Sequence, residues 1–281
     1  MRLVENKTYD EERALYNLKD CEVKKCLFAG VRDGESALKE ARNIKVIDCN
    51  FSLRYPMWHV KKFELINSNL DELTRAPLWY DNDGVIDNVT ISSVKAIREC
   101  NNILVKNSHI DSKEFGWKSK QIKITDSVIN SEYIFLDSSD ITINNLEFSG
   151  KYSFQYVENL VIDNSSLDTK DAFWHSKNVT VKNSLVKGEY LGWFSDGLTL
   201  INCKIIGTQP LCYCKNLKLI NCTMEDTDLA FEYSELAADI IGNILSIKNP
   251  KSGHIKADSI GAIIKEDSIM EDTCDIVIRN T

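Results

Sequence analysis

Glu99, Lys118 and Asp137 follow one another at steps of 19 residues, and together they could form an acid–base cluster. If equal steps correspond to successive turns of a parallel coil, equivalent residues lie ~4.8 Å apart and Lys118 can contact both carboxylates. One carboxylate would then transfer protons while Lys118 stabilises the negative charge. The competing interpretation is a charge-compensated surface ladder, which contributes little energy. The three residues are therefore candidate catalytic groups.

His59, Tyr80, Tyr156 and His175 belong to the same series, whereas Tyr133, Tyr152 and Tyr190 stand four residues earlier in their turns, in a second outward column. His175 is a fourth candidate catalytic group, as a general acid or base, and His59 is a candidate hydrogen-bonding arm for a sugar. Rows of exposed aromatic rings usually mark a partner, and flat rings beside charges suit sugars and protein interfaces equally. The competing interpretations are half-exposed amphipathic rings or rings covered by a loop. The predicted substrate-binding set is His59, Tyr80, Tyr133, Tyr152, Tyr156 and Tyr190.

A repeat runs through most of the chain and must position these residues. Its pattern is apolar, any, apolar, any, Asn, Ser or Cys, any, apolar, as in NILVKNSHI and NLVIDNSSL. Copies begin at 20, 43, 62 and 83, and from there every 19 residues to 216. Apolar, β-branched residues two positions apart predict a strand with one buried face. Asn at the sixth position tolerates the left-handed backbone of a tight bend and can bond its equivalent in the next turn. The expected ladder is Asn67, Asn88, Asn107, Asn145, Asn164, Asn183, Asn202 and Asn221.

A second strand of six or seven residues is expected in each turn, as in DAFWHSK and YLGWFSD. Strict alternation from the small residues that precede each copy places the tryptophans inside and the residues between them outside. We therefore expect Trp58, Trp79, Trp117, Trp174 and Trp193 to be mostly buried. If the alternation is reversed, the face that carries Trp residues and Arg98 becomes the binding candidate.

Composition excludes several classes of partner. The formal net charge is −8 and no Lys/Arg run occurs, which argues against a nucleic acid or an anionic membrane. The charged start predicts no signal peptide, and no stretch has the apolar length of a membrane span. Nine cysteines are an odd number, so we expect free thiols and a cytoplasmic, reducing location. Cys203, Cys212, Cys214 and Cys222 are interpreted as small core residues, and no metal or other cofactor is predicted.

The stretches ALYNLKDC, DGESALKEARNI, SLDTKDAFWHSKNVTVKNS and KGEYLGW resemble a bacterial family known only as a domain of unknown function. Over essentially the whole chain the sequence resembles the pectin-lyase-like right-handed β-helix superfamily. The resemblance implies an all-β, single-stranded right-handed parallel β-helix. It brings no known catalytic residues, and the carbohydrate chemistry frequent in the superfamily is only an analogy of fold.

We therefore predict one β-helix domain over residues 1–281, with about 12 turns of 19 residues. Residues 1–19 would form an N-terminal turn or cap, and residues 235–281 a degenerate turn and a C-terminal cap that protects the edge. Two functions remain open. The first is a carbohydrate-binding or carbohydrate-active protein that uses the aromatic and charged outer face for an oligosaccharide. The second is a non-enzymatic scaffold, or a homo-oligomer formed through the aromatic face.

Overall fold

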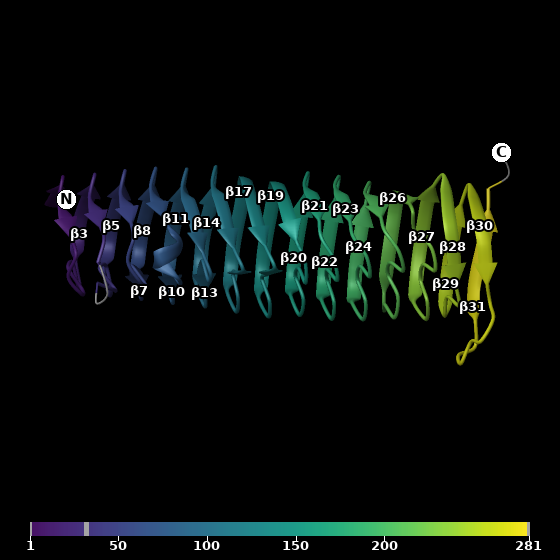
Figure 1. Cartoon of the computed structure of the whole chain (residues 1–281). Helices are drawn as coiled ribbons and strands as arrows, with labels where there is room; N and C mark the ends of the chain where they lie inside the picture. Colours follow the sequence, from purple (N-terminus) through teal and green to yellow (C-terminus); the bar gives the residue numbers. More distant parts are fainter. Residues whose placement is uncertain (1, 31–33, 280–281) are drawn as a thin grey trace. The chain divides into compact units, whose positions relative to one another are not determined.

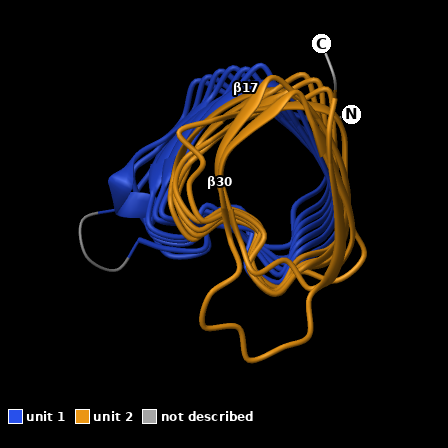
Figure 2. Ribbon diagram, turned by 90° about the vertical axis from the view of Figure 1, so that its right-hand side faces the viewer, with its two compact units in different colours: residues 1–142 blue, residues 143–281 orange. Residues whose placement is uncertain are grey.

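The computed structural model describes residues 2–30 and 34–279. The chain is an all-β right-handed parallel solenoid with a spacing of about 19 residues, as the sequence predicts (Figure 1). It divides into two compact units, residues 1–142 and residues 143–281 (Figure 2). Strand β19 (Ser139–Gly150) contains the boundary between them.

Unit 1 repeats a path of up to three strands per turn. The first strands are β1 (Arg2–Glu5), β3 (Lys19–Lys24), β5 (Arg42–Ile47), β8 (Lys61–Ile66), β11 (Asn82–Asp87), β14 (Asn101–Lys106) and β17 (Lys120–Ser131). The second are β2 (Thr8–Tyr9), β4 (Leu27–Phe28), β6 (Asn50–Phe51), β9 (Asn69–Leu70), β12 (Thr90–Ser93) and β15 (His109–Ser112). The third are β7 (Met57–Trp58), β10 (Leu78–Trp79), β13 (Ile97–Arg98), β16 (Glu114–Phe115) and β18 (Tyr133–Ile134). One 3₁₀ helix, η1 (Glu72–Thr74), lies between β9 and β10.

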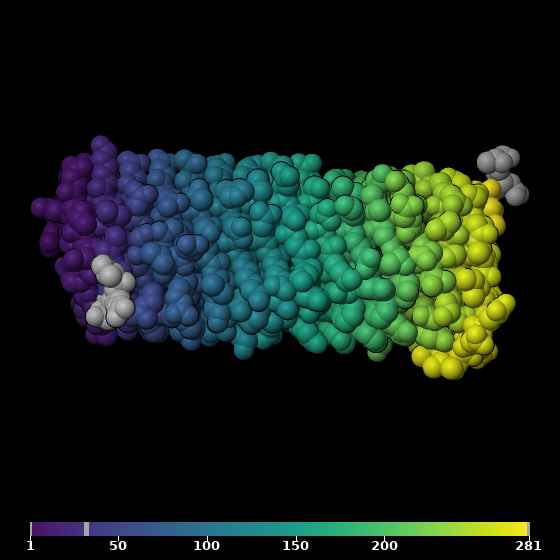
Figure 3. All heavy atoms as spheres, in the orientation of Figure 1, coloured from purple at the N-terminus to yellow at the C-terminus, as the bar shows by residue number. Residues whose placement is uncertain are grey.

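Unit 2 follows the same plan, but its described residues contain no separate two-residue third strand. Its first strands are β20 (Glu158–Asp163), β22 (Lys177–Lys182), β24 (Asp196–Ile201), β26 (Leu217–Glu225), β27 (Glu235–Ile241), β29 (Ser252–Ala257) and β31 (Thr273–Ile278). The others are β21 (Ser166–Asp168), β23 (Leu185–Lys187), β25 (Lys204–Ile206), β28 (Asn243–Lys248) and β30 (Ser259–Ile264). A loop between β30 and β31 projects from this unit (Figures 1 and 3). The solenoid has about 14 turns, which is close to the predicted 12.

The core consists of columns of equivalent apolar residues, because the first strands pair in parallel and in register. In unit 1, Val23 pairs with Val46, which pairs with Leu65. In unit 2, Val181 pairs with Leu200 at the equivalent position. All of these side chains are buried. Burying apolar area in this way is the main term that stabilises the fold.

The predicted asparagine bend is confirmed. All eight asparagines have a left-handed backbone, with φ between 48° and 55°. Amide side chains link neighbouring turns, as from Asn88 to Asn67 at 2.9 Å and from Asn221 to Asn202 at 2.8 Å. Buried serines next to this bend form a second ladder, in which the Ser108 hydroxyl accepts the backbone N–H of Val89 and the Ser127 hydroxyl that of Ser108.

The predicted alternation on the third side of each turn is wrong. The middle residues, expected outside, are fully buried, as Met57, Leu78 and Phe154 illustrate. The five tryptophans, expected inside, are half-buried at the surface. The physical reason is that this segment is no regular strand: Tyr152, Phe154 and Tyr156 all have positive φ. Left-handed residues rotate the side-chain directions, so the two-residue period of a strand does not apply.

No helix in the described residues is long and apolar enough to cross a membrane.

Candidate functional site

A single outward corner of each turn carries most of the predicted site residues. In unit 1 it holds His59, Tyr80, Glu99, Lys118 and Asp137, here called the unit 1 strip. In unit 2 it holds Tyr156, His175, Phe194 and Tyr213, here called the aromatic strip. All nine residues have φ between 52° and 59°. Each corner is held by the backbone, since the N–H of His59 donates to Trp79 O and that of His175 to Trp193 O, both at 3.0 Å.

The trio Glu99, Lys118 and Asp137 lies in consecutive turns of the unit 1 strip, as the repeat predicts. Its charged groups do not converge. Glu99 is drawn to its neighbour Arg98, whose Nε lies 3.6 Å from Glu99 Oε1. Lys118 and Asp137 are exposed, and neither forms an ion pair within the described ranges. No ion pair therefore joins the three residues within the described ranges, and their acid–base role stays a prediction.

His59 instead has a carboxylate partner that the sequence analysis missed. His59 Nδ1 lies 2.9 Å from Glu40 Oε1, and the ring of Tyr80 lies 5.2 Å away on the next turn. Glu40 occupies the corner of the preceding turn, because its N–H donates to Trp58 O. Extending the corner column back by one copy would have found it. The contact orients the imidazole, whose side chain is 44 % exposed.

Beside the unit 1 strip runs a stack of rings and cations. Trp58 and Trp79 stack with centroids 5.7 Å apart, and the Arg98 guanidinium lies 5.5 Å from Trp79 and 5.3 Å from Trp117. Lys39 Nζ lies 4.5 Å from the ring of Trp58. Arg98 also contacts Glu114 at 3.2 Å, so its charge is compensated. Arg98 thus forms cation–π contacts with the tryptophans of two neighbouring turns.

The aromatic strip is a continuous stack of rings in unit 2. Centroid distances are 5.0 Å from Tyr156 to His175, 5.0 Å from His175 to Phe194 and 4.8 Å from Phe194 to Tyr213. The planes deviate from parallel by only 7° to 12°. Tyr156 is 54 % exposed and Phe194 44 %. Because each ring face covers the next, the stack presents its ring edges to solvent.

A surface hollow of about 440 Å³ borders the aromatic strip. Its lining also includes Ser176 and three charged residues, Lys177, Asp196 and Lys215, each two positions after a residue of the strip and in register across three turns. Asp196 accepts a hydrogen bond from the Asn216 amide at 2.8 Å. Lys177 and Lys215 are exposed and have no ion-pair partner in the part of unit 2 that the structure describes. The hollow therefore combines aromatic edges with two available ammonium groups.

At Tyr213, the last residue of the aromatic strip, the surroundings shift the pKa of the side chain. Partial burial, reinforced by the Glu232 carboxylate, raises the pKa of the Tyr213 hydroxyl above its ordinary value. Glu232 forms an ion pair with Lys248 at 2.9 Å, and this hydrogen bond raises the pKa of Lys248. Tyr213 is therefore a neutral hydroxyl at physiological pH.

The other predicted tyrosines, Tyr133, Tyr152 and Tyr190, belong to neither strip and stand four residues before the corner position of their turns. The backbone carbonyl of Tyr133 accepts the indole N–H of Trp117 at 2.8 Å, and that of Tyr190 accepts the indole N–H of Trp174 at 2.6 Å. Lys151 Nζ lies 5.4 Å from the ring of Tyr152. All three tyrosines are half-buried. The carbonyls of Tyr133 and Tyr190 thus help to position Trp117 and Trp174.

The nine cysteines are buried and free, as predicted. A hydrogen bond with Cys222 lowers the pKa of Cys203 to about 7, and the same contact raises that of Cys222. The described residues contain no group of three or more His, Cys, Asp or Glu side chains that could hold a metal ion.

Comparisons with known proteins give a family but no activity. A model of the DUF3737 family, described as proteins of unknown function, matches residues 2–278. No curated protein matches the sequence. Among solved structures, PfbA, a surface adhesin of Streptococcus pneumoniae, is similar with a TM-score of 0.52, 9 % identity and 82 % of both chains covered.

Two further structures are less similar. The A-module of the mannuronan C-5 epimerase AlgE6 from Azotobacter vinelandii has a TM-score of 0.42 and 11 % identity, covering 98 % of this chain and 86 % of that one. A mutant tailspike protein of E. coli bacteriophage HK620, in complex with a hexasaccharide, has a TM-score of 0.45 and 9 % identity, covering 92 % and 60 %. At these identities the likeness concerns the fold alone.

Proposed function

We propose that this chain, which belongs to the DUF3737 family, binds an acidic oligosaccharide along the aromatic strip of unit 2. The observation that carries the proposal is the pairing of exposed ring edges with two ammonium groups that have no ion-pair partner in the described residues, around one hollow of about 440 Å³.

The chemistry of the two walls selects an anion. Aromatic rings carry partial positive charge at their edges, so edge-on rings attract oxygen atoms. Lys177 and Lys215 add two full positive charges, against the single carboxylate of Asp196. Since Asp196 is already engaged by Asn216, the lysines can bind carboxylate or sulfate groups of a ligand.

The regular rise of the strip favours a linear polymer. Equivalent side chains of successive turns recur at the ~4.8 Å spacing of paired strands. A chain of sugar units that lies along the solenoid axis would present similar groups to successive rungs, so several weak contacts add up. The backbone of the strip is held by hydrogen bonds between turns, and little ordering cost arises on binding.

The direct test measures binding of oligouronates to the purified protein by calorimetry, with uncharged oligosaccharides of equal length alongside. We expect oligouronates to bind and the uncharged series to bind at least tenfold more weakly. The double variant Lys177→Gln/Lys215→Gln should weaken oligouronate binding, and the loss should shrink at high salt because screening removes the same interaction. Phe194→Ala should weaken both series.

Lys218→Gln is a matched control, since Lys218 is an exposed lysine of the neighbouring strand β26 and does not line the hollow. Equal affinity of the double variant and the parent protein, or no binding of any acidic oligosaccharide, would refute the proposal.

A second function, assembly with a protein or with another copy, is favoured by one feature of the same strip. Four stacked rings with exposed edges make a ridge, and rows of exposed aromatic side chains in soluble proteins commonly lie at interfaces. Sedimentation of the parent protein and of Phe194→Ala distinguishes it: an oligomer that dissociates in the variant supports assembly, and monomers in both exclude self-association.

A further inference from the structure

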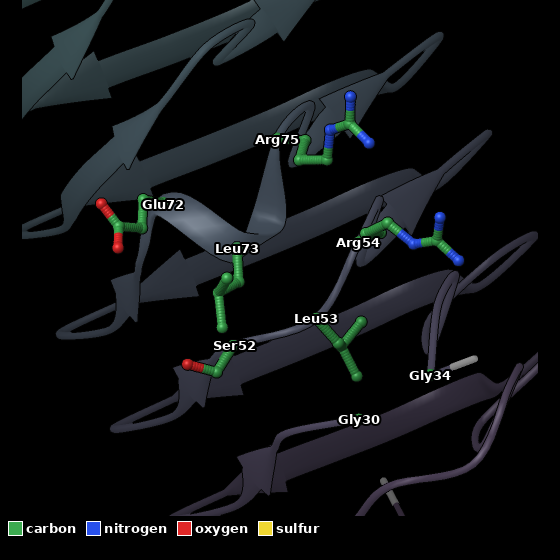
Figure 4. Close-up of a pocket in the computed structure, with 8 residues that line it drawn as sticks. All are labelled: Gly30, Gly34, Ser52, Leu53, Arg54, Glu72, Leu73 and Arg75. Carbon is green, nitrogen blue, oxygen red and sulfur yellow. The ribbon is translucent and has the colours of Figure 1, made fainter. Parts of the chain in front are cut away.

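Both copies of the repeat that exceed its usual length contribute to one hollow in unit 1. The copy that begins at residue 20 is four residues longer than the standard 19, and the copy that begins at 62 is two longer. The hollow, of about 300 Å³, is lined by Gly30 and Gly34 from the first and by Glu72, Leu73 and Arg75 from the second. Ser52, Leu53 and Arg54 of the intervening copy complete it (Figure 4). In repeat proteins, insertions that share one face commonly build the binding surface.

The backbone segments at Gly30 and Gly34 approach each other closely. A Cβ on Gly30 would lie 2.3 Å from Gly34 Cα, and one on Gly34 would lie 2.8 Å from the carbonyl oxygen of Asp10. Only glycine permits this backbone crossing. The two glycines therefore fix one wall of the hollow rather than fill it with side chains.

Two arginines supply the charge of this hollow. Figure 4 shows the guanidinium groups of Arg54 and Arg75 extending in the same direction from neighbouring turns, with the Glu72 carboxylate turned away from them. Arg54 pairs with Glu35, at 3.3 Å between its terminal nitrogen and the carboxylate. Arg75 has no carboxylate partner among the residues described for unit 1. One guanidinium is thus available, and the second is held beside it.

Arg75 is kept where its backbone is strained. Its φ of 56° and ψ of −60° are those of a γ-turn, closed by a hydrogen bond of 2.6 Å from Ala76 N–H to Thr74 O. This conformation is rare and strained for a non-glycine residue. Glycine would adopt it more easily, so replacing Arg75 by glycine is expected to relieve the strain. Arg75 adds no carboxylate contact to the described fold, which directs attention to a ligand.

We propose that this hollow binds a small organic anion, a phosphate monoester or carboxylate that carries an apolar group. The guanidinium of Arg75, supported by Arg54, would hold the anion through paired N–H donors. The apolar part would contact Leu73, which is 55 % exposed, above the buried Leu53. The site lies in unit 1 and shares no residue with the aromatic strip, so it stands independently of the proposed oligosaccharide binding.

The experiment uses phenyl phosphate and benzoate as probes, with phenol as the uncharged counterpart, in calorimetric titrations of the full chain. We expect at least one of the two anions to bind and phenol to bind at least tenfold more weakly. Arg75→Gly should abolish anion binding and raise the thermal midpoint, because it removes the guanidinium and the strain together. Arg75→Lys should retain part of the affinity.

Arg13→Gly is the matched control. Arg13 is also an exposed arginine with a left-handed backbone, φ 54°, but it pairs with Glu12 and lies outside the hollow. It should bind the probes as the parent protein does. The proposal is overturned if neither anion binds the parent protein, or if Arg75→Gly binds as tightly as the parent.

Discussion

Asp81 is a buried carboxylic acid. Because burial raises its pKa, unit 1 should become less stable as the pH rises. Asp81 stands in a column of small inward residues, next to Cys100 and then Ser119 in the following turns. Its Oδ1 accepts the Val60 N–H at 2.7 Å, whereas its Oδ2 has no hydrogen-bond partner in the described residues. Burial raises the pKa of Asp81 well above its ordinary value, against the smaller lowering effect of the Val60 N–H.

The sign of the pH dependence follows from linkage. The folded protein keeps the Asp81 proton at pH values at which the unfolded chain, with a pKa near 3.8, has lost it. The contribution of this group to stability is therefore full below the unfolded pKa and is lost as the pH rises through the folded pKa. In that window the free energy of unfolding falls by about 1.4 kcal/mol per pH unit for one proton.

Asp81→Asn removes this dependence while it keeps an oxygen for the Val60 N–H. Between pH 5 and pH 7 the variant should gain stability relative to the parent protein, because only the parent loses stability as the pH rises above the pKa of the unfolded acid. Asp81→Ser should behave alike, because the Ser119 hydroxyl accepts the Cys100 N–H in the same manner at 3.1 Å.

Urea unfolding at the two pH values measures the difference, and hydrogen exchange at the Val60 amide reports it locally, which matters because solenoids can open turn by turn. Asp111→Asn, an exposed residue of β15, is the control and should leave the pH profile unchanged. A stability difference between Asp81→Asn and the parent that is equal at pH 5 and pH 7 would refute the reasoning.

Three further predictions concern the unit 1 strip, the insertion and the core. Lys118→Met should change the free energy of unfolding by less than about 0.5 kcal/mol and leave ligand binding intact, since Lys118 forms no ion pair in the described ranges. Loss of a measured activity in this variant would instead support the hypothesis of an acid–base cluster. Gly34→Ala should cost about 1–3 kcal/mol in urea unfolding because its Cβ would lie 2.4 Å from Gly30 Cα, whereas Gly242→Ala, with no atom within 4 Å, reports backbone strain alone. Phe154→Ala should cost about 3–5 kcal/mol, because the ring is fully buried and stacks on Phe173 at 5.3 Å; Trp193→Ala, at a half-buried position, should cost less, and the reverse order would contradict the corrected alternation.

The repeat made much of the fold predictable. Columns such as Val46 and Val105, or Asn88 and Asn107, follow from counting alone, because parallel strands in register bring residues one repeat apart into contact. Counting also predicts which residues share a strip, since residues one repeat apart stack on each other whether their side chains point inward or outward. His175 and Tyr156 therefore meet as the spacing implies.

What failed is whatever depends on the backbone between columns. The alternation rule assumes extended residues, and the positive φ of Tyr152, Phe154 and Tyr156 breaks it, so the tryptophans were placed inside the core. The structure of the insertions was equally unpredictable from the repeat. The hollow of Arg54 and Arg75 forms where the period changes, and the repeat defines no register for those residues. Contacts of flexible side chains, such as that of Glu99 with Arg98 rather than Lys118, also lie beyond what spacing determines.

The left-handed corner has a consequence for how proteins of this build diversify. Histidine, tyrosine, glutamate, lysine and aspartate all occupy it with φ between 52° and 59°, and the hydrogen bonds that hold it belong to the main chain. The outward residue of each turn can therefore change identity without disturbing the neighbouring rungs. Selection for a ligand and selection for folding act on different positions, so a relative could acquire a new specificity by a series of single substitutions, each acceptable to the fold.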